Sequence, residues 1–337
     1  MKNSDIIRIF MARVTPTGWA MNLNDWGWNT GVMIYCMSRL YEESGDPELY
    51  AYIKSWIDNH MEKEQFGSVN FVIPAHGLLT LTNNADIYKE KADKHAKWCK
   101  EDALLTCDGG FAHVWGNSDS LPDYENQLWL DSLYMTTTYM VRYGLKFGDE
   151  EIIEKALKQI DIHMAGAFDE ETGLCFHAYH SKEKRTMGQR WGRGNGWVAA
   201  ALADVILMLD GKKWNLDKYK RLVTKMIRSA YDLRCREDNM LHTVIDNPNS
   251  YTEYTATMLF SIAVFDLHKL SLIDKEIYEW AKELAAASPK MIGDKGPIEK
   301  CSAGTEPDSM ESYLDRAFTE TFYAYGLFMM LNAHNDY

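Results

Sequence analysis

One aspartate stands among large apolar side chains and is the first candidate for chemistry. Asp131 follows Trp129 by two positions and is followed by Leu133, Tyr134 and Met135. Burial in such surroundings raises the pKa of a carboxyl group, so Asp131 could hold a proton near neutral pH and act as a general acid. The structural alternative is an aspartate that caps a helix or bonds a neighbouring backbone group.

The densest cluster of chemically capable residues is the segment Arg190-Trp-Gly-Arg-Gly-Asn-Gly-Trp197. Glycine lets a backbone approach a ligand closely, and a guanidinium binds a carboxylate through two parallel hydrogen bonds. The segment would therefore suit an anionic ligand with a flat apolar face. The alternative is a tight turn in which Arg193 pairs with an internal acid such as Glu253.

Histidines near these two motifs are further candidates for the same site. His177 and His180 lie shortly before the Arg/Trp segment, and His113 follows a Gly-Gly turn, although any of them could be structural. The sequence contains no HExxH motif, no convergent acidic cluster and no GxSxG motif. We therefore expect no metal and no serine hydrolase of the common type.

Charge and composition exclude several classes of partner. Acidic residues outnumber basic ones, 49 to 36, and no local cluster of Lys or Arg offsets the net charge of −13, so nucleic acid is not an expected partner. The first residues are polar and no apolar run is long enough to cross a bilayer, so we expect neither an export signal nor a membrane span. Six scattered cysteines are typical of reduced thiols, which favours a cytoplasmic location.

Helices must position these candidate residues. The chain has only eight prolines in 337 residues, and long stretches show the apolar i, i+3, i+4, i+7 pattern. Residues 151–164 carry one apolar stripe and predict a solvent-facing helix. Residues 196–209 are apolar nearly all round and predict a helix that is buried on every side.

These two kinds of helix alternate along a chain that we expect to form one domain over residues 1–337. The buried helices begin near residues 28, 70, 127, 193, 252 and 319, each at a cluster of Gly, polar and aromatic residues. Six irregular hairpins indicate a closed toroid of six inner and six outer helices, with an open solenoid as the alternative. In a toroid the starts of the inner helices converge on one mouth, which the aperiodic stretch 288–309 could cover.

The motifs Trp129-Leu-Asp131-Ser-Leu-Tyr-Met and Arg190-Trp-Gly-Arg-Gly-Asn-Gly-Trp197 resemble those of a known enzyme family. In this order and separation they are similar to the unsaturated rhamnogalacturonyl hydrolases of glycoside hydrolase family 105, relatives of the unsaturated glucuronyl hydrolases of family 88. The resemblance extends from Trp28-Asn-Thr-Gly to Glu253-Tyr-Thr-Ala-Thr and so spans most of the chain. It implies an all-α fold, the (α/α)6 barrel.

The resemblance also implies a reaction. Such enzymes hydrate the C4=C5 double bond that a polysaccharide lyase leaves on a non-reducing uronic acid, here most specifically in unsaturated galacturonyl-rhamnose. Protonated Asp131 would donate to C4, and its carboxylate would serve as the base for the water that adds at C5. The hemiketal then opens and releases the neighbouring sugar. The expected partner is an unsaturated uronate-containing disaccharide or short oligosaccharide, and no metal or organic cofactor is implied.

Substrate-binding roles are carried over by the same resemblance. They fall on seven residues: Trp28, His113, Trp129, His177, Trp191, Arg193 and Trp197. Of these, Arg193 matches an arginine near the uronate. One position departs from the family pattern, because relatives commonly carry a second Asp at the start of the second inner helix, where this chain reads Asn70-Phe-Val. The departure bears on how the substrate hydroxyls are held.

Two other classes of function remain open. An inverting hydrolase on the same toroid would need a second carboxylate roughly 6.5–9.5 Å from Asp131, for which Glu253 and Glu320 are candidates. A sugar epimerase would be a further enzymatic alternative. A non-catalytic toroid, in which the aromatic rings only stack on sugar, would show tight binding without turnover.

Overall fold

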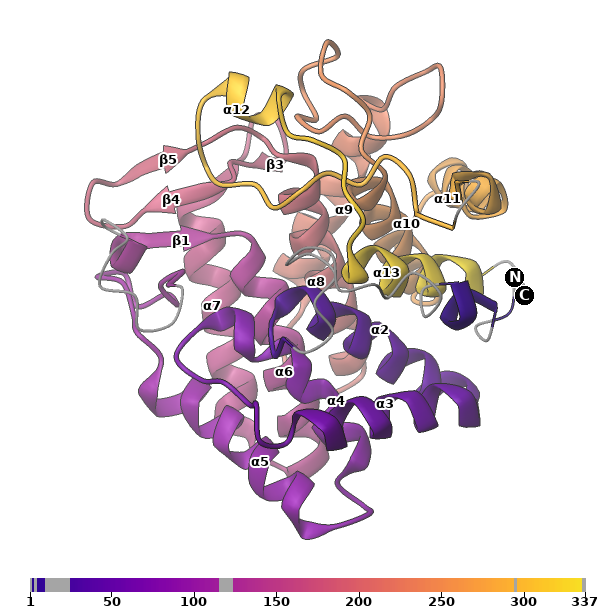
Figure 1. Ribbon diagram of the computed structural model, residues 1–337. Helices are drawn as coiled ribbons and strands as arrows, with labels where there is room; N and C mark the ends of the chain where they lie inside the picture. The colour runs from indigo at the N-terminus through magenta and orange to yellow at the C-terminus, as the bar shows by residue number, and fades with distance from the viewer. Residues whose placement is uncertain (1, 3–4, 10–24, 115–123, 294–295, 335–337) are drawn as a thin grey trace.

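Helices arranged in a ring dominate the computed structural model, which describes residues 2, 5–9, 25–114, 124–293 and 296–334 (Figure 1). Within this part of the chain, six helices form the inner wall. They are α2 (Trp28–Ser44), α4 (His76–Leu81), α6 (Asp131–Phe147), α8 (Gly192–Leu209), α10 (Tyr254–His268) and α13 (Phe322–Ala333). The predicted all-α (α/α)6 toroid is confirmed, and the open solenoid is excluded.

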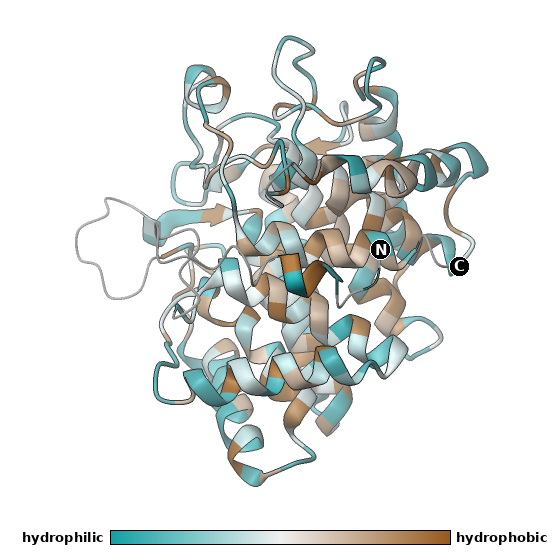
Figure 2. Ribbon diagram, turned by 45° about the vertical axis from the view of Figure 1, so that its right-hand side comes forward, coloured by the Kyte–Doolittle hydropathy of each residue, from teal (hydrophilic) through white to brown (hydrophobic). Residues whose placement is uncertain are grey.

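The outer wall consists of helices that each follow an inner helix in the sequence. They are α3 (Pro47–His60), α5 (Asp86–Lys97), α7 (Glu150–Ala167), α9 (Asp217–Asp232) and α11 (Lys275–Ala287). Residues 5–9 are also helical, and Ile6 is buried in the core. Hydrophilic residues lie along the outward faces of the peripheral helices, whereas the central helices are mostly apolar (Figure 2).

The burial of α7 and α8 follows the two predicted patterns. In α7, Ile152, Ile153 and Ile160 are buried on one stripe, and Asp149 caps the helix by accepting a hydrogen bond from the Ile152 N–H at 3.2 Å. In α8, every residue from Gly192 to Ile206 is buried. A helix that is apolar on all sides is stable only when other helices surround it, as the inner wall does here.

Two inner helices begin four or more residues later than their sequence predicted. The second was expected from residue 70, but short 3-10 turns precede α4, because Pro74 has no N–H to donate within a helix. The third was expected from residue 127, but Gln127–Trp129 forms strand β1 and α6 begins at Asp131. In both places the helix start carries a loop or strand that faces the mouth.

The ring is closed by contact between its first and last inner helices. Helix α13 packs along α2, and the Tyr323 N–H donates to Asn29 Oδ1 at 3.0 Å. Gly326 permits this close approach, since a Cβ there would lie 2.7 Å from the Cα of Met33. The two segments are far apart in sequence and side by side in space.

Short strands at the mouth were not predicted. β1 pairs with β4 (Ala178–His180), which pairs with β5 (Arg185–Met187), and β2 (Phe168–Asp169) pairs with β3 (Leu174–Cys175); all pairs are antiparallel. The stretch 288–309, described except for residues 294–295, leads into the short helix α12 (Met310–Leu314) beside these strands (Figure 1). Among the described helices, none is long and apolar enough to cross a membrane.

Candidate active site

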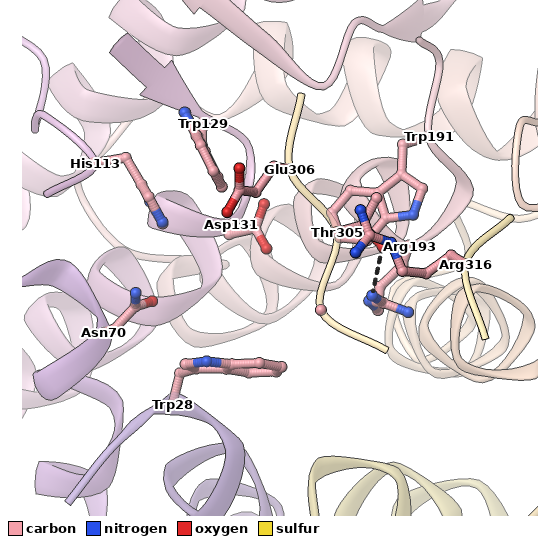
Figure 3. A pocket seen from close by; sticks show the side chains of 11 residues that line it. Trp28, Asn70, His113, Trp129, Asp131, Trp191, Arg193, Thr305, Glu306 and Arg316 are labelled. Carbon is pink, nitrogen blue, oxygen red and sulfur yellow. Dashed lines mark hydrogen bonds between the residues drawn. The ribbon is translucent and has the colours of Figure 1, made fainter. Parts of the chain in front are cut away.

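The mouth of the ring opens into a cavity of about 400 Å³, a size that suits a small ligand. The starts of three inner helices contribute to it, as the toroid predicted: Trp28 opens α2, Asp131 opens α6, and Arg193 lies in the first turn of α8. Figure 3 shows these side chains around one space. The lining residues are Trp28, Asn70, His113, Trp129, Asp131, Trp191, Arg193, Gly304, Thr305, Glu306 and Arg316.

Strand pairing places Asp131 beside His177. Trp129 of β1 lies opposite Ala178 of β4, and the Leu130 N–H donates to the His177 carbonyl oxygen at 3.1 Å. As a result, Asp131 Oδ2 lies 3.6 Å from His177 Nε2. Both atoms are buried, and neither has a hydrogen-bond partner in the described part of the chain.

The pKa of the Asp131 carboxyl lies below its usual value, and the expectation of a raised pKa is therefore wrong. Burial is the largest single influence and acts upward, but it is outweighed by the polar contact with His177 and by the charge of Arg193 and, at the acidic pH where a carboxyl titrates, of His177 and His113. The expectation considered only the apolar neighbours of Asp131 in the sequence. The fold also places His177 and His113, which come from other segments of the chain, beside Asp131, and both lower its pKa.

His177 is held by a tyrosine from α12. Tyr313 Oη lies 2.7 Å from His177 Nδ1 and accepts a hydrogen bond from the Gln189 N–H at 3.3 Å. Since the Gln189 N–H uses this oxygen as an acceptor and leaves the hydroxyl proton free, we infer that the Tyr313 hydroxyl donates to Nδ1 and leaves the ring proton on Nε2, facing Asp131. Burial lowers the pKa of His177, with Asp131 acting in the opposite direction.

Aromatic rings form the walls of the cavity. His113 stacks on Trp129 with ring centres 4.2 Å apart and planes 3° from parallel. His113 Nδ1 lies 3.1 Å from Ser132 Oγ, and burial lowers the pKa of His113 to about 4 despite the Asp131 carboxylate. Trp28 presents its ring from the other side (Figure 3). These rings could stack on the apolar faces of a sugar.

Arg193 lines the cavity but is already paired. Its Nη1 lies 3.3 Å from Glu253 Oε1, and both side chains are almost completely buried. The same guanidinium donates to Ser302 Oγ at 2.7 Å and to the Ala303 carbonyl oxygen at 2.7 Å. The structure thus contains the ion pair that the sequence analysis left open as the alternative to carboxylate binding.

The Arg/Trp segment serves packing more than was expected. A Cβ at Gly192 would lie 2.5 Å from the His242 carbonyl oxygen, and one at Gly196 would lie 2.8 Å from Leu259. These glycines therefore permit close contact within the protein rather than with a ligand. Trp197 is fully buried against Tyr134, with ring centres 4.8 Å apart, and is not among the described residues that line the cavity.

The other predicted site residues also divide into those that line the cavity and those that do not. Of the expected binding residues, His177 reaches the site through Asp131, whereas Trp28, His113, Trp129, Trp191 and Arg193 line the cavity directly. Neither Glu253 nor Glu320 is among the described residues that line it. Glu253 instead caps α10 by accepting from the Ala256 N–H at 2.7 Å.

Sequence reasoning missed two charged residues of the cavity. Glu306 and Arg316 come from the segments on either side of α12 and point into the same space as Asp131 (Figure 3). Burial and the neighbouring Glu306 carboxylate raise the pKa of Tyr124. The only signal for Glu306 was its place in the stretch 288–309, which was expected at the mouth. Among the described residues, no cluster of three or more acidic, His or Cys side chains could hold a metal ion.

A helical toroid whose mouth combines carboxyl groups with indole walls is typical of one class of carbohydrate-processing enzyme, the toroidal glycoside hydrolases. The chain belongs to glycosyl hydrolase family 88, whose model matches residues 5–335. It is 26% identical over 287 residues to the unsaturated rhamnogalacturonyl hydrolase YesR of Bacillus subtilis, covering 83% of this chain and 80% of that protein.

Solved structures share the fold. A possible member of family GH105 from Salmonella enterica superposes with a TM-score of 0.88 at 22% identity, covering 100% of this chain and 94% of that one. The unsaturated glucuronyl hydrolase of Bacillus sp. GL1 superposes with a TM-score of 0.68 at 15% identity, covering 93% of this chain and 87% of that one.

Proposed function

We propose that this chain is an unsaturated uronyl hydrolase that hydrates the C4=C5 enol ether of lyase-derived oligosaccharides, with Asp131 as general acid and base. The observation that carries the proposal is the position of Asp131 at the cavity, with an unpartnered oxygen among aromatic walls. The name of the relative YesR, an unsaturated rhamnogalacturonyl hydrolase, supports the same reaction. It also favours galacturonyl-rhamnose as the substrate.

The reaction needs one carboxyl group in two protonation states. Protonated Asp131 donates to C4 while the electron pair of the double bond forms the new C–H bond, and the ring oxygen shares the positive charge that develops at C5. Water then adds at C5 and passes a proton to the Asp131 carboxylate. The hemiketal opens and the aglycone sugar leaves, so Asp131 is regenerated in its acid form.

Because the pKa of Asp131 is lowered in the free protein, the carboxyl must become easier to protonate when substrate binds. The substrate carboxylate has this effect, since it brings a negative charge into the cavity and a like charge raises the pKa of a neighbouring carboxyl. His177 keeps Asp131 oriented through the contact at 3.6 Å. On this view Trp28, Trp129 and Trp191 hold the sugar faces.

A second carboxylate in the cavity favours one competing function. Glu306 lines the same space as Asp131, so an inverting hydrolase acting on intact glycosides has a candidate base here that Glu253 and Glu320 do not provide. The two reactions differ in substrate, since an inverting hydrolase does not require a double bond.

The test is a panel of disaccharides. The protein is mixed with unsaturated disaccharides prepared by several lyases and with their saturated counterparts, and both the enol-ether absorbance and the released sugar are followed. Loss of absorbance with unsaturated galacturonyl-rhamnose, and no release from the saturated compound, is the expected result. Release from the saturated disaccharide would replace the proposal with inverting hydrolysis.

A further inference from the structure

The substrate of the proposed function is an anion, and the cavity must offer it a cation. Among the described residues that line the cavity, the arginines are Arg193 and Arg316. His113 does not contribute a charge at neutral pH, because burial lowers its pKa to about 4. Asp131 and Glu306 would oppose a further carboxylate. An arginine is therefore the side chain on which binding of the uronate depends.

Arg193 is poorly suited to this role. Its charge is balanced by Glu253 at 3.3 Å, and the two side chains are 1% and 0% exposed. Its planar guanidinium lies against two aromatic rings, with Cζ 4.5 Å from the ring centre of Trp191 and 5.6 Å from that of Tyr323. A second carboxylate at this guanidinium would compete with a buried one that has no access to water.

Arg316 has the opposite surroundings. It follows α12, its side chain is only partly buried, and its Nη2 donates to Ser312 Oγ at 3.2 Å. Its Nε is buried and has no hydrogen-bond partner among the described residues. The fork of Nε and Nη that binds a carboxylate in two places is thus not committed to an acid.

The arrangement of the cavity fits this assignment. Figure 3 shows Arg316 and Trp191 on one side, Asn70 and His113 on the other, and Asp131 between them. In an unsaturated uronate the carboxylate is attached to C5, C4 is next to C5, and the hydroxyl groups lie beyond C4. A sugar whose carboxylate meets Arg316 therefore presents C4 to Asp131 and its hydroxyl groups to Asn70.

Two further donors lie on this path. Trp191 Nε1 and Asn70 Nδ2 are both buried and have no hydrogen-bond partner in the described part of the chain. Each can donate to a ligand oxygen, one near the carboxylate and one near the hydroxyl groups. Unpaired buried donors are uncommon in folded proteins and are explained when a ligand supplies the acceptor.

We propose that Arg316 binds the uronate carboxylate and thereby selects acidic substrates and sets the position of C4 against Asp131. This assignment rests on the proposed function. It makes Arg316 a specificity-determining residue contributed by the segment that crosses the mouth.

The test compares an acid with its neutral ester. Binding of galacturonate and of its methyl ester is measured by tryptophan fluorescence, and turnover is measured separately with the unsaturated disaccharide. Arg316→Ala should weaken galacturonate binding and raise KM by about 10- to 100-fold, while ester binding stays within about twofold. Arg316→Lys should recover part of the loss. Arg221→Ala, which removes an exposed arginine on α9, is the matched control and should change neither.

The outcomes separate the two proposals. Turnover of the unsaturated disaccharide together with an acid preference that survives in Arg316→Ala would overturn the assignment of Arg316 and leave the function standing. An acid preference that depends on Arg316, without turnover in the wild type, would overturn the proposed function alone. Failure of the wild-type protein to prefer galacturonate over its ester would overturn the role of Arg316.

Discussion

Replacing Arg193 by methionine tests whether this arginine supports the fold or binds substrate. The change keeps most of the side-chain volume and removes the guanidinium from Glu253, which is 0% exposed. Breaking a buried ion pair from one side costs about 3–5 kcal/mol, because the remaining charge is left without a partner. The carbonyl oxygens of Ser302 and Ala303 lose a donor as well.

This cost converts into a measurable shift in melting temperature. For a chain of 337 residues, the unfolding entropy near the midpoint is about 0.7 kcal/mol per kelvin. Arg193→Met should therefore lower Tm by about 4–7 °C in differential scanning calorimetry. Arg228→Met is the matched control, since Arg228 pairs with Asp274 and Glu276 at the surface and its loss should cost about 0–1 kcal/mol.

A double variant isolates the charge effect. In Arg193→Met combined with Glu253→Gln no unpaired charge remains, so the two substitutions should be non-additive by about 0.5–3 kcal/mol, with the double variant more stable than their sum predicts. The acid preference of the surviving folded enzyme should be unchanged. A variant that melts within about 1 °C of the wild type but loses its preference for acid over ester would refute this reasoning and make Arg193 the carboxylate ligand.

Three further changes probe the chemistry. Asp131→Asn should lower kcat by about a hundred- to ten-thousandfold with little change in Tm, because the amide has nearly the same size but delivers no proton; near-normal kcat would exclude Asp131 as the acid. Since the pKa of Asp131 is below its usual value in the free protein and the reaction needs its protonated form, kcat/KM should fall about tenfold per pH unit between about pH 6 and 9, and a flat profile would contradict the mechanism. Tyr313→Phe should lower kcat by about two- to tenfold and shift this pH profile while KM holds, because His177 loses its partner at Nδ1; an unchanged profile would remove Tyr313 from the positioning of His177.

Local patterns were enough to predict the ring. The stripe of α7 and the all-round apolar character of α8 follow from residues within one helix, so periodicity alone assigned them to the outer and inner walls. The cluster of polar and aromatic residues at each inner start likewise placed Trp28 and Asp131 at one mouth. Strands as short as β1 and β4 carry too few residues for a pattern, and they were missed.

The electrostatics of the site depended on contacts that no local pattern carries. Strand pairing brings His177 to Asp131, 46 positions earlier in the sequence, and His177 is the largest of the influences that lower the pKa of Asp131. Glu306 and Arg316 come from aperiodic chain around α12, where neither spacing nor composition indicates that they face Asp131. Whether Arg193 would pair with Glu253 or with a ligand could be posed from the sequence, but only the fold places Ser302 and Ala303 around it.

The packing of α13 along α2 determines when the site can form during synthesis of the protein. The cavity takes Trp28 from the first inner helix and Glu306 and Arg316 from the chain just before the last one, so a nascent polypeptide has an open arc and no finished site until its last inner helix has left the ribosome. Until then the face of α2 that packs against Gly326, with Met33 and Cys36, is uncovered. A substrate that contacted both Trp28 and Arg316, as proposed above, would add its binding energy to the stability of the contact between α2 and α13. Supply of substrate should therefore protect the enzyme from proteases that trim its last helix.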